Sequence, residues 1–443
     1  MASLAEDSTT TASTTATAPA PAAPPGTDRF LRMWVAPVVV FFAIRAIGLL
    51  VLADMAYLNG KSLGDRLAAW DGEWMLAIAE HGYAGVPVHL TDAWGIHTAD
   101  TAYAFFPGYP YLVSLVANLP LVSTYGAALF VNVVLCVFAA AGVARLGALC
   151  TERMATATPA PWHRMRSALP EALSRTLPES SEPRPAPASE ADPYTVGLIA
   201  VALFAATPMS IVLNMAYTEA LFCALAVWAL IGVLEERWLL AGLCALFAGA
   251  TRPTGVVVIG TVILVGLLAL RRRPGRQEAS RIWAAIVLSP LGYLGFLCVV
   301  WAHTGHPLGW FTIQTDGWDT RFDFGVAAVR FVNDSLAHSG DVAPVATAWI
   351  MLSTPLLIAV AVWSRLPWPV LLYAALVVVS IMASSGLMMS RARLLLPAFV
   401  LLIPFAVLLT RRRPAAILAA LVPVVAGSSW FGAYMLTVYP HAM

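Results

Sequence analysis

The chain has 443 residues, of which 59% are hydrophobic and only 12% are charged, whereas an ordinary soluble domain is roughly 25% charged. This composition excludes a soluble globular protein and indicates an integral membrane protein. The formal net charge of +1 gives no indication of a nucleic-acid partner, so the positions of the arginines are more informative than their sum.

The N-terminal residues 1–30 are rich in Ala, Thr and Pro. They lack the basic and apolar regions of a cleaved signal peptide, and we interpret them as a disordered cytoplasmic tail. A polytopic domain then occupies residues 31–443. Within it, the segment 151–193 is rich in Pro, Ser, Glu and Arg and is predicted to be a disordered cytoplasmic loop.

Apolar runs recur from residue 34 almost to the C-terminus. Arginine clusters at 271–273 and 411–413 mark cytoplasmic loops, because such loops retain Lys and Arg. The sequence therefore predicts an all-α, multi-pass protein of the cell membrane with a cytoplasmic N-terminus and about eleven transmembrane helices. The expected helices are 34–53, 124–147, 195–213, 217–234, 238–251, 254–270, 282–302, 346–364, 368–386, 394–410 and 415–437.

This orientation places two long loops, 54–123 and 303–345, outside the cell membrane. Residues 105–119 are also apolar, but counting them as a crossing would move the arginine-rich loops to the outer side. We interpret them as a juxtamembrane or re-entrant helix, and Pro107 and Pro110 suit the start of a helix better than its interior. Chemistry is therefore expected on the outer face.

Acids and tryptophans gather at helical spacing between residues 70 and 83 of the first outer loop. At about 100° per residue, Asp71 shares the apolar face with Trp74, whereas Glu73 points the other way. Asp71 is thus the carboxylate most removed from water, and such removal makes a carboxylate a better general base. Asp71 could equally cap the helix beginning at Gly72, and the two roles can coexist.

Glu73 and His81 could contact acceptor hydroxyls or a divalent metal ion, although a solvated helix face explains them equally well. Histidines also occur at positions 89, 97, 303 and 306. None of these spacings is specific for a metal. We therefore assign no metal ligand and no certain cofactor, and leave a divalent metal ion as an open alternative.

Arginines stand at the outer ends of two predicted spans. Arg391 and Arg393 begin a span where Lys and Arg are disfavoured, so an anionic partner is expected, and guanidinium groups bind phosphate oxygens in pairs. Arg252, at a break between two helices, fits the same role, with internal pairing to Glu219 as the alternative. Glu219 either caps its own helix, where a negative charge suits the dipole, or faces the same cavity as Asp71.

Two other sets of residues give weaker signals. Arg45 lies inside the first span, where a charge usually faces a bundle interior, and Asp54 is its possible partner. The loop 303–345 contains Trp310, Gln314 and Trp318, which suit stacking on sugar rings and hydrogen bonding to hydroxyls. Interfacial tryptophans are also common in membrane proteins without any ligand.

Four short blocks follow one another along the chain. They are Trp70-Asp71 followed by Ile78-Ala79-Glu80-His81-Gly82-Tyr83, then Ala104-Phe105-Phe106-Pro107-Gly108-Tyr109-Pro110, Ala216-Tyr217-Thr218-Glu219-Ala220-Leu221-Phe222 and Ala250-Thr251-Arg252-Pro253-Thr254-Gly255. In this order they resemble the PIG-V-like (GPI mannosyltransferase II-like) mannosyltransferases of the GT-C glycosyltransferase superfamily, over residues 34–410. The Ala- and Arg-rich, Lys-poor composition is typical of high-GC bacteria, so the resemblance is to a bacterial, actinobacterial-type member.

The resemblance implies a GT-C-like bundle that transfers a hexose, usually mannose, from a polyprenyl-phosphate-linked donor with inversion at the anomeric carbon. The acceptor would be a cell-envelope glycolipid, glycan or protein on the extracytoplasmic side. Asp71 would be the general base, and Tyr83 would contact substrate. Arg391 and Arg393 would hold the donor phosphate, although Ala392 replaces the aromatic residue usually found beside such an arginine.

Two other functions fit part of the same pattern. A lipid or small-molecule transporter also has many spans and few membrane charges, but carriers usually have repeated halves and polar sites at the midplane. We find no repeat in this sequence, and its acids and arginines gather at one face. A non-catalytic protein that binds polyprenyl lipid is the second alternative, because an intact acid indicates capacity and not turnover.

Overall fold

The computed structural model describes residues 30–156 and 190–441, and the structural statements below refer to these residues. Its regular structure is helical, and the one bridge between extended residues in this part of the chain joins Phe322 and Ser384. The prediction of an all-α polytopic fold is therefore confirmed. The expected tail lies outside the described residues except for Phe30, and so does the middle of the expected loop at 151–193.

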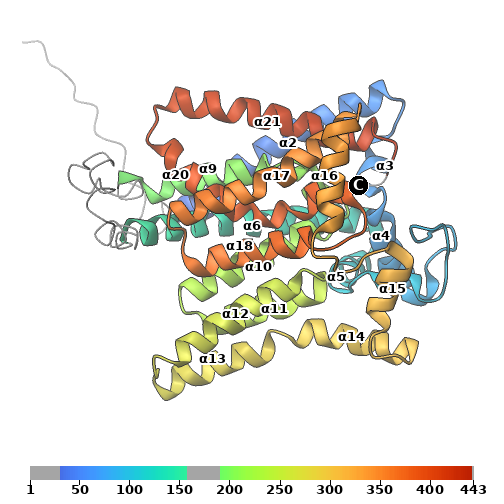
Figure 1. Ribbon diagram of the computed structural model, residues 1–443, viewed down its shortest axis with the longest axis horizontal. Helices are drawn as coiled ribbons and strands as arrows, with labels where there is room; N and C mark the ends of the chain where they lie inside the picture. The colour runs from blue at the N-terminus through green and yellow to red at the C-terminus, as the bar shows by residue number, and fades with distance from the viewer. Residues whose placement is uncertain (1–29, 157–189, 442–443) are drawn as a thin grey trace, which may run out of the picture.

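The helices form one bundle with short helical turns between its members (Figure 1). In chain order they are η1 (Leu31–Val35), α2 (Ala36–Leu58), α3 (Leu63–Ala68), α4 (Asp71–His81), η2 (Tyr83–Gly85), η3 (Thr101–Ala104), α5 (Gly108–Ala117), α6 (Thr124–Thr156), α9 (Pro193–Ala205), η5 (Ser210–Asn214), α10 (Glu219–Leu234), α11 (Trp238–Thr251), α12 (Gly255–Leu270), α13 (Arg276–Leu288), α14 (Leu291–Thr304), α15 (Gly309–Trp318), α16 (Val326–His338), α17 (Val342–Trp363), α18 (Trp368–Met382), η6 (Met388–Ser390), α19 (Arg391–Leu394), η7 (Leu396–Leu402), α20 (Ile403–Thr410) and α21 (Pro414–Thr437).

Five described segments are long and apolar enough to cross a membrane: Leu31–Leu58, Thr124–Thr156, Arg276–Thr304, Val342–Trp363 and Pro414–Thr437. A sixth arises if the bent pair Met388–Leu394 and Leu396–Thr410 is one span. The protein is thus a membrane protein. The other expected ranges contain shorter apolar helices, namely α9, α10, α11, α12 and α18, so the number of crossings stays a prediction.

The apolar segment 105–119 forms α5, which has only 10 residues. At 1.5 Å per residue it is about 15 Å long, half of the roughly 30 Å hydrocarbon core, as expected of a juxtamembrane or re-entrant helix. Gly108 allows α5 to approach α11 closely, because a Cβ there would lie 2.8 Å from the carbonyl oxygen of Ala250. This contact places α5 beside Thr251 and Arg252.

The two ends of the bundle differ in content. Helices α3, α4, α15 and α16 lie at one end, which we call the loop end (Figure 1). The turns between α12 and α13 and between α20 and α21 lie at the opposite end, which we call the arginine end because it carries Arg271–Arg273 and Arg411–Arg413.

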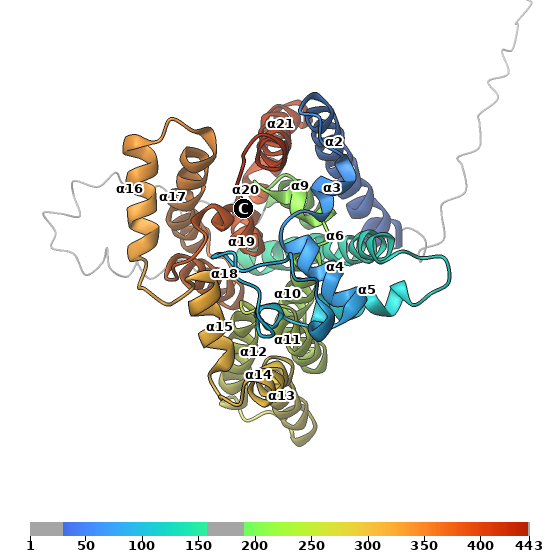
Figure 2. The ribbon, with the colours of Figure 1, turned by 90° about the vertical axis from the view of Figure 1, so that its right-hand side faces the viewer.

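Helix α10 is the central element of the core. It is apolar on all sides and almost entirely buried, as expected of a helix surrounded by others. It packs against α6 and α11, and Figure 2 shows it within the bundle when viewed from the loop end. Its first residue at the loop end is Glu219, so the fold places one carboxylate at the centre of that end.

Arg45 of α2 is buried, but its partner is not Asp54, which is exposed. The guanidinium donates to the carbonyl oxygen of Ala205 (3.1 Å), to Ser210 Oγ (2.6 Å) and to Asn214 Oδ1 (2.8 Å). Helix α9 ends at Ala205, where carbonyl groups lose their helical partners. Arg45 therefore stabilises the break between α9 and η5 with neutral acceptors.

The expected loop at 151–193 begins too early, because α6 continues to Thr156. Thr151 Oγ1 donates to the carbonyl oxygen of Gly147 at 2.8 Å. Thr151 and Met154 are both buried. Packing against the core therefore extends this helix beyond the end of its apolar run.

Candidate active site

Asp71 forms an ion pair with Arg393 at the loop end. Asp71 Oδ2 lies 2.6 Å from Arg393 Nη2, and the two side chains are 34% and 8% exposed. Trp70 occupies the N-cap position of α4. Within the described residues Trp70 makes no side-chain hydrogen bond to cap the helix, and Asp71 is the first residue of α4 rather than the residue before it.

The first turn of α4 presents Asp71 as its sequence pattern predicts. Trp74, Met75 and Ile78 of the same helix are buried, whereas Glu73 is exposed. The apolar residues hold α4 against the bundle. Asp71 is left at the edge of this buried face, half-covered and turned toward Arg393.

Glu219 lies behind this pair and joins it to a second arginine. The Glu219 carboxylate is fully buried, and its Oε1 lies 3.2 Å from Arg252 Nη1 and 3.4 Å from Arg393 Nη1. Arg252 has an extended backbone between α11 and α12, as expected of a residue before proline. Glu219 is therefore the internal partner that was the alternative for Arg252. It begins α10 and does not itself line the cavity described below.

Arg391 differs from the other two arginines because no carboxylate in the described chain lies within ion-pair distance of it. Its guanidinium donates to the carbonyl oxygens of Ser384 (2.6 Å) and Ser385 (2.5 Å) and to Ser384 Oγ (3.1 Å). Its Nε is buried and has no hydrogen-bond partner among the described residues. This buried cation can accept an anion without losing an ion pair.

Asp323 lies in the turn that precedes α16. Its carboxylate accepts hydrogen bonds from the N–H groups of Ala327 (2.7 Å) and Gly325 (2.9 Å). The Ala327 N–H lowers the pKa of Asp323 most, and the Gly325 N–H and the charge of Arg391 add to this effect. The Asp323 carboxylate is therefore ionised and bound to N–H groups at the start of α16.

A cavity of about 430 Å³ opens beside these charges. Four of the predicted site residues line it: Asp71, Arg252, Arg391 and Arg393. The remaining wall is largely apolar or aromatic and comes from α4, the 104–106 turn, α12, α14, α15 and α18. The aromatic and polar members of this wall include Phe105, Phe106, Tyr293, Trp310, Gln314, Trp318 and Thr320.

Three predicted site residues lie elsewhere. Glu73 and His81 are on the exposed side of α4 and do not line the cavity. Tyr83 stacks on Tyr103 with 4.6 Å between ring centroids, and its hydroxyl donates to the carbonyl oxygen of Phe105 at 2.8 Å. Tyr83 thus supports a cavity wall from behind.

Replacing Tyr83 with phenylalanine is expected to lower stability by about 1 kcal/mol at neutral pH, because the bond to Phe105 is lost. Burial raises the pKa of Tyr83 above its usual value, and Tyr111 and Tyr103 add to this effect. Above about pH 10 the unfolded chain releases this proton and the folded chain does not. The advantage of the wild type over the variant should therefore shrink as the pH rises.

Thermal unfolding in detergent at pH 8 and pH 11 measures this difference. Because other buried tyrosines also titrate, only the difference between wild type and variant is informative. A difference that is the same at both pH values would contradict the assignment of a buried Tyr83 hydroxyl.

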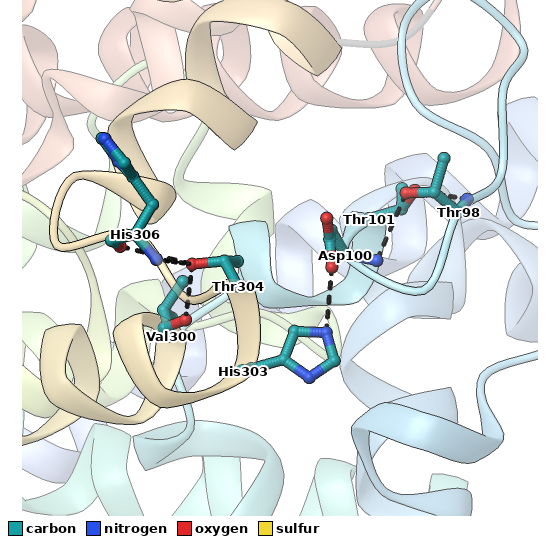
Figure 3. Close-up of polar contacts among 7 residues, drawn as sticks. All are labelled: Thr98, Asp100, Thr101, Val300, His303, Thr304 and His306. Carbon is teal, nitrogen blue, oxygen red and sulfur yellow. Dashed lines mark hydrogen bonds and ion pairs between the residues drawn. The ribbon is translucent and has the colours of Figure 1, made fainter.

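A polar contact ties the first long loop to the end of α14. His303 Nε2 lies 2.9 Å from Asp100 Oδ1 (Figure 3). The Tyr103 ring stacks on His303 with 4.2 Å between the ring centroids. Thr304 Oγ1 donates to the carbonyl oxygen of Val300 beside it. This contact holds the loop near α15, whose tryptophans line the cavity. In the described part of the chain, no three His, Cys, Asp or Glu side chains gather closely enough to hold a metal ion.

Several residues of the site carry no signal in the sequence. Helix α18 ends at Met382 and not at 386 as expected, so Ser384 and Ser385 lie in a loop where their oxygens bind Arg391. Tyr217 is buried beneath the Asp71–Arg393 pair. The small, uncharged residues around 383–386 could have indicated the helix end, but nothing in them indicates an arginine partner.

No family model and no curated protein matches this chain. Among solved structures, the chain is similar to the crystal structure of the apo form of the Archaeoglobus fulgidus oligosaccharyltransferase, at 11% sequence identity and a TM-score of 0.42. The match covers 90% of this chain and 56% of that one, so the chain spans about half the length of this neighbour. A likeness this distant assigns the chain to no family.

Proposed function

We propose that the protein is a GT-C glycosyltransferase that transfers mannose from a polyprenyl-phosphate-linked donor to a glycolipid, glycan or protein of the cell envelope. The observation that supports this most is the convergence of Asp71, Arg252, Arg391 and Arg393 on one cavity with apolar and aromatic walls. A site for a small molecule is typically an apolar cavity into which a small number of polar groups point. A lipid-linked sugar phosphate likewise combines a charged, polar head with an apolar chain.

The charge balance of the site favours a donor with a single negative charge. Of the three arginines, Arg252 and Arg393 form ion pairs with Glu219 and Asp71, so Arg391 is the one whose guanidinium has only neutral oxygens as hydrogen-bond partners among the described residues. The phosphodiester of a polyprenyl phosphate sugar carries one negative charge. A nucleotide sugar carries two, and its nucleoside would meet apolar walls.

The transfer we propose is a single displacement. Asp71 takes the proton of an acceptor hydroxyl, and that oxygen bonds to the anomeric carbon from the side opposite the phosphate. The bond from the anomeric carbon to the phosphate oxygen breaks, and the polyprenyl phosphate leaves with the electron pair. Arg391 and Arg393 stabilise its charge, and no protonation is needed because phosphate is a good leaving group.

The resting ion pair suggests how Asp71 becomes available as a base. Arg393 is bound to Asp71, and a donor phosphate would compete for the same guanidinium with bidentate hydrogen bonds. We propose that this competition frees the carboxylate once the donor is bound. Trp310, Trp318 and Gln314 then provide surfaces for the sugar ring.

The cavity faces the extracytoplasmic side in this proposal. The arginine clusters 271–273 and 411–413 lie at the opposite end of the bundle (Figure 1). Loops rich in arginine stay in the cytoplasm, which supports this orientation. The resemblance of the four sequence blocks to PIG-V-like mannosyltransferases supports the same side and the same donor.

The test incubates the purified full chain with polyprenyl-phosphate-mannose carrying a radioactive sugar and with a membrane lipid extract. We expect a new labelled lipid or glycan, and no product when GDP-mannose replaces the lipid-linked donor. Use of GDP-mannose alone would overturn the proposed donor. Movement of unaltered lipid across vesicles without product would instead support a transporter.

A further inference from the structure

Tyr217 lies outside the cavity lining but beneath both members of the Asp71–Arg393 pair. It precedes α10, and only 1% of its surface is exposed. Its hydroxyl donates to the carbonyl oxygen of Ala69 at 3.0 Å. Ala69 is two residues before Asp71, so the hydroxyl holds the turn from which the carboxylate projects.

The turn held in this way has an unusual backbone conformation. Trp70, between Ala69 and Asp71, has φ 57° and ψ −115°, a conformation that a bulky L-residue rarely adopts. Such a residue persists only where the surrounding structure fixes it. The Tyr217 hydroxyl fixes one side, and the Ala216 N–H donates to the carbonyl oxygen of Leu67 at 3.0 Å.

The ring of Tyr217 also touches the first turn of α4. A Cβ at Gly72 would lie 3.3 Å from Tyr217 Cε1, so glycine lets the helix rest directly on the ring. Any tilt of the ring would therefore move Asp71, which is the neighbour of Gly72. The carboxylate has a defined position because its helix begins on this surface.

The same ring carries the arginine of the pair. The guanidinium carbon of Arg393 lies 5.1 Å from the centroid of Tyr217, within the distance of a cation–π contact. One side chain therefore supports the proposed base through its hydroxyl and the proposed phosphate ligand through its ring. These two contributions come from different atoms, so different substitutions separate them.

We propose that Tyr217 is a positioning residue for glycosyl transfer, which fixes Asp71 through its hydroxyl and Arg393 through its ring. This inference rests on the proposed function of the same site. It predicts that loss of the hydroxyl lowers the rate of the chemical step. Loss of the ring should in addition weaken binding of the donor.

Kinetics of two variants test the separation. Tyr217→Phe keeps the ring and should lower kcat roughly ten-fold, which corresponds to one lost hydrogen bond, with the donor KM unchanged. Tyr217→Leu loses the ring as well and should also raise the donor KM by about ten-fold. A wild-type kcat in Tyr217→Phe, or equal KM changes in both variants, would overturn the proposal.

Tyr109→Phe is the matched control. Tyr109 is fully buried, and its hydroxyl donates to the carbonyl oxygen of Ala128 in α6 at 3.4 Å, not to the turn before α4. It should show a shift in thermal unfolding but wild-type kcat and KM. An equal loss of kcat in Tyr109→Phe would show that the effect of Tyr217 is general packing.

Binding of polyprenyl phosphate, measured without any acceptor, separates failure of this inference from failure of the proposed function. Binding should weaken about ten-fold in Tyr217→Leu and stay unchanged in Tyr217→Phe. If no variant or wild-type protein transfers sugar but this pattern holds, the transferase function fails and the support of Arg393 by Tyr217 stands. Equal binding by all three proteins would overturn that support.

Discussion

Replacing Asp71 with asparagine is expected to abolish sugar transfer while the protein still inserts and folds. Asparagine has the same shape and can still accept a hydrogen bond from Arg393, but it cannot take the acceptor proton. A general base contributes a factor of about 10² to 10⁴ to the rate, and kcat should fall by that amount. Donor binding should be equal or tighter, because the charge that competes for Arg393 is gone.

Initial rates and donor binding, measured on the same preparation, check this result. Glu73→Gln is the matched control, since Glu73 lies on the same helix but on its exposed side. That variant should keep nearly full activity. Near-full activity in Asp71→Asn would remove Asp71 from the mechanism, whatever the control shows.

Arg393→Gln should lower the rate of transfer by a similar factor, because Arg393 is proposed to hold the phosphate of the donor. Loss of a preorganised charge at the leaving group lowers kcat by about 10² to 10³, and the donor KM should rise. Stability should fall by about 1–3 kcal/mol, because Asp71 loses its partner and Glu219 keeps only Arg252. Arg393→Lys keeps the charge without the planar fork and should lie between glutamine and wild type.

Steady-state kinetics with a varied donor, together with thermal unfolding, distinguish these effects. Unchanged donor affinity in Arg393→Gln would show that Arg393 is structural. The double variant with Asp71→Asn is also informative, because residues in contact give non-additive effects. The stability loss from Arg393→Gln should be smaller in that background, where no charged partner at position 71 is left behind.

The sequence predicted the positions of most helices and the face of α4 that carries Asp71. Both follow from local periodicity: apolar residues at Trp74, Met75 and Ile78 determine which side of the helix is buried. Pro107 and Pro253 likewise mark helix boundaries that the structure has, because proline restricts its own and the preceding backbone.

The partners of the charged residues could not be predicted in the same way. Arg393 was expected to need an anion, but the anions beside it within the protein are Asp71 and Glu219, from distant parts of the chain. For Arg45 the sequence offers Asp54 as the partner, whereas the observed acceptors belong to Ala205, Ser210 and Asn214. Such pairs form only when separate helices pack together, and the local sequence pattern of one helix does not predict which other helices it will contact.

The lengths of the central helices explain why there is a cavity at all. Helices α10, α11, α12 and α18 have 16, 14, 16 and 15 residues, about 21–24 Å each, against a hydrocarbon core of about 30 Å. The cavity wall includes residues at or beside their ends, such as Thr218, Thr251 and Ser384. The cavity thus lies where α11 and α18 end and where α10 and α12 begin, in space that longer helices would occupy.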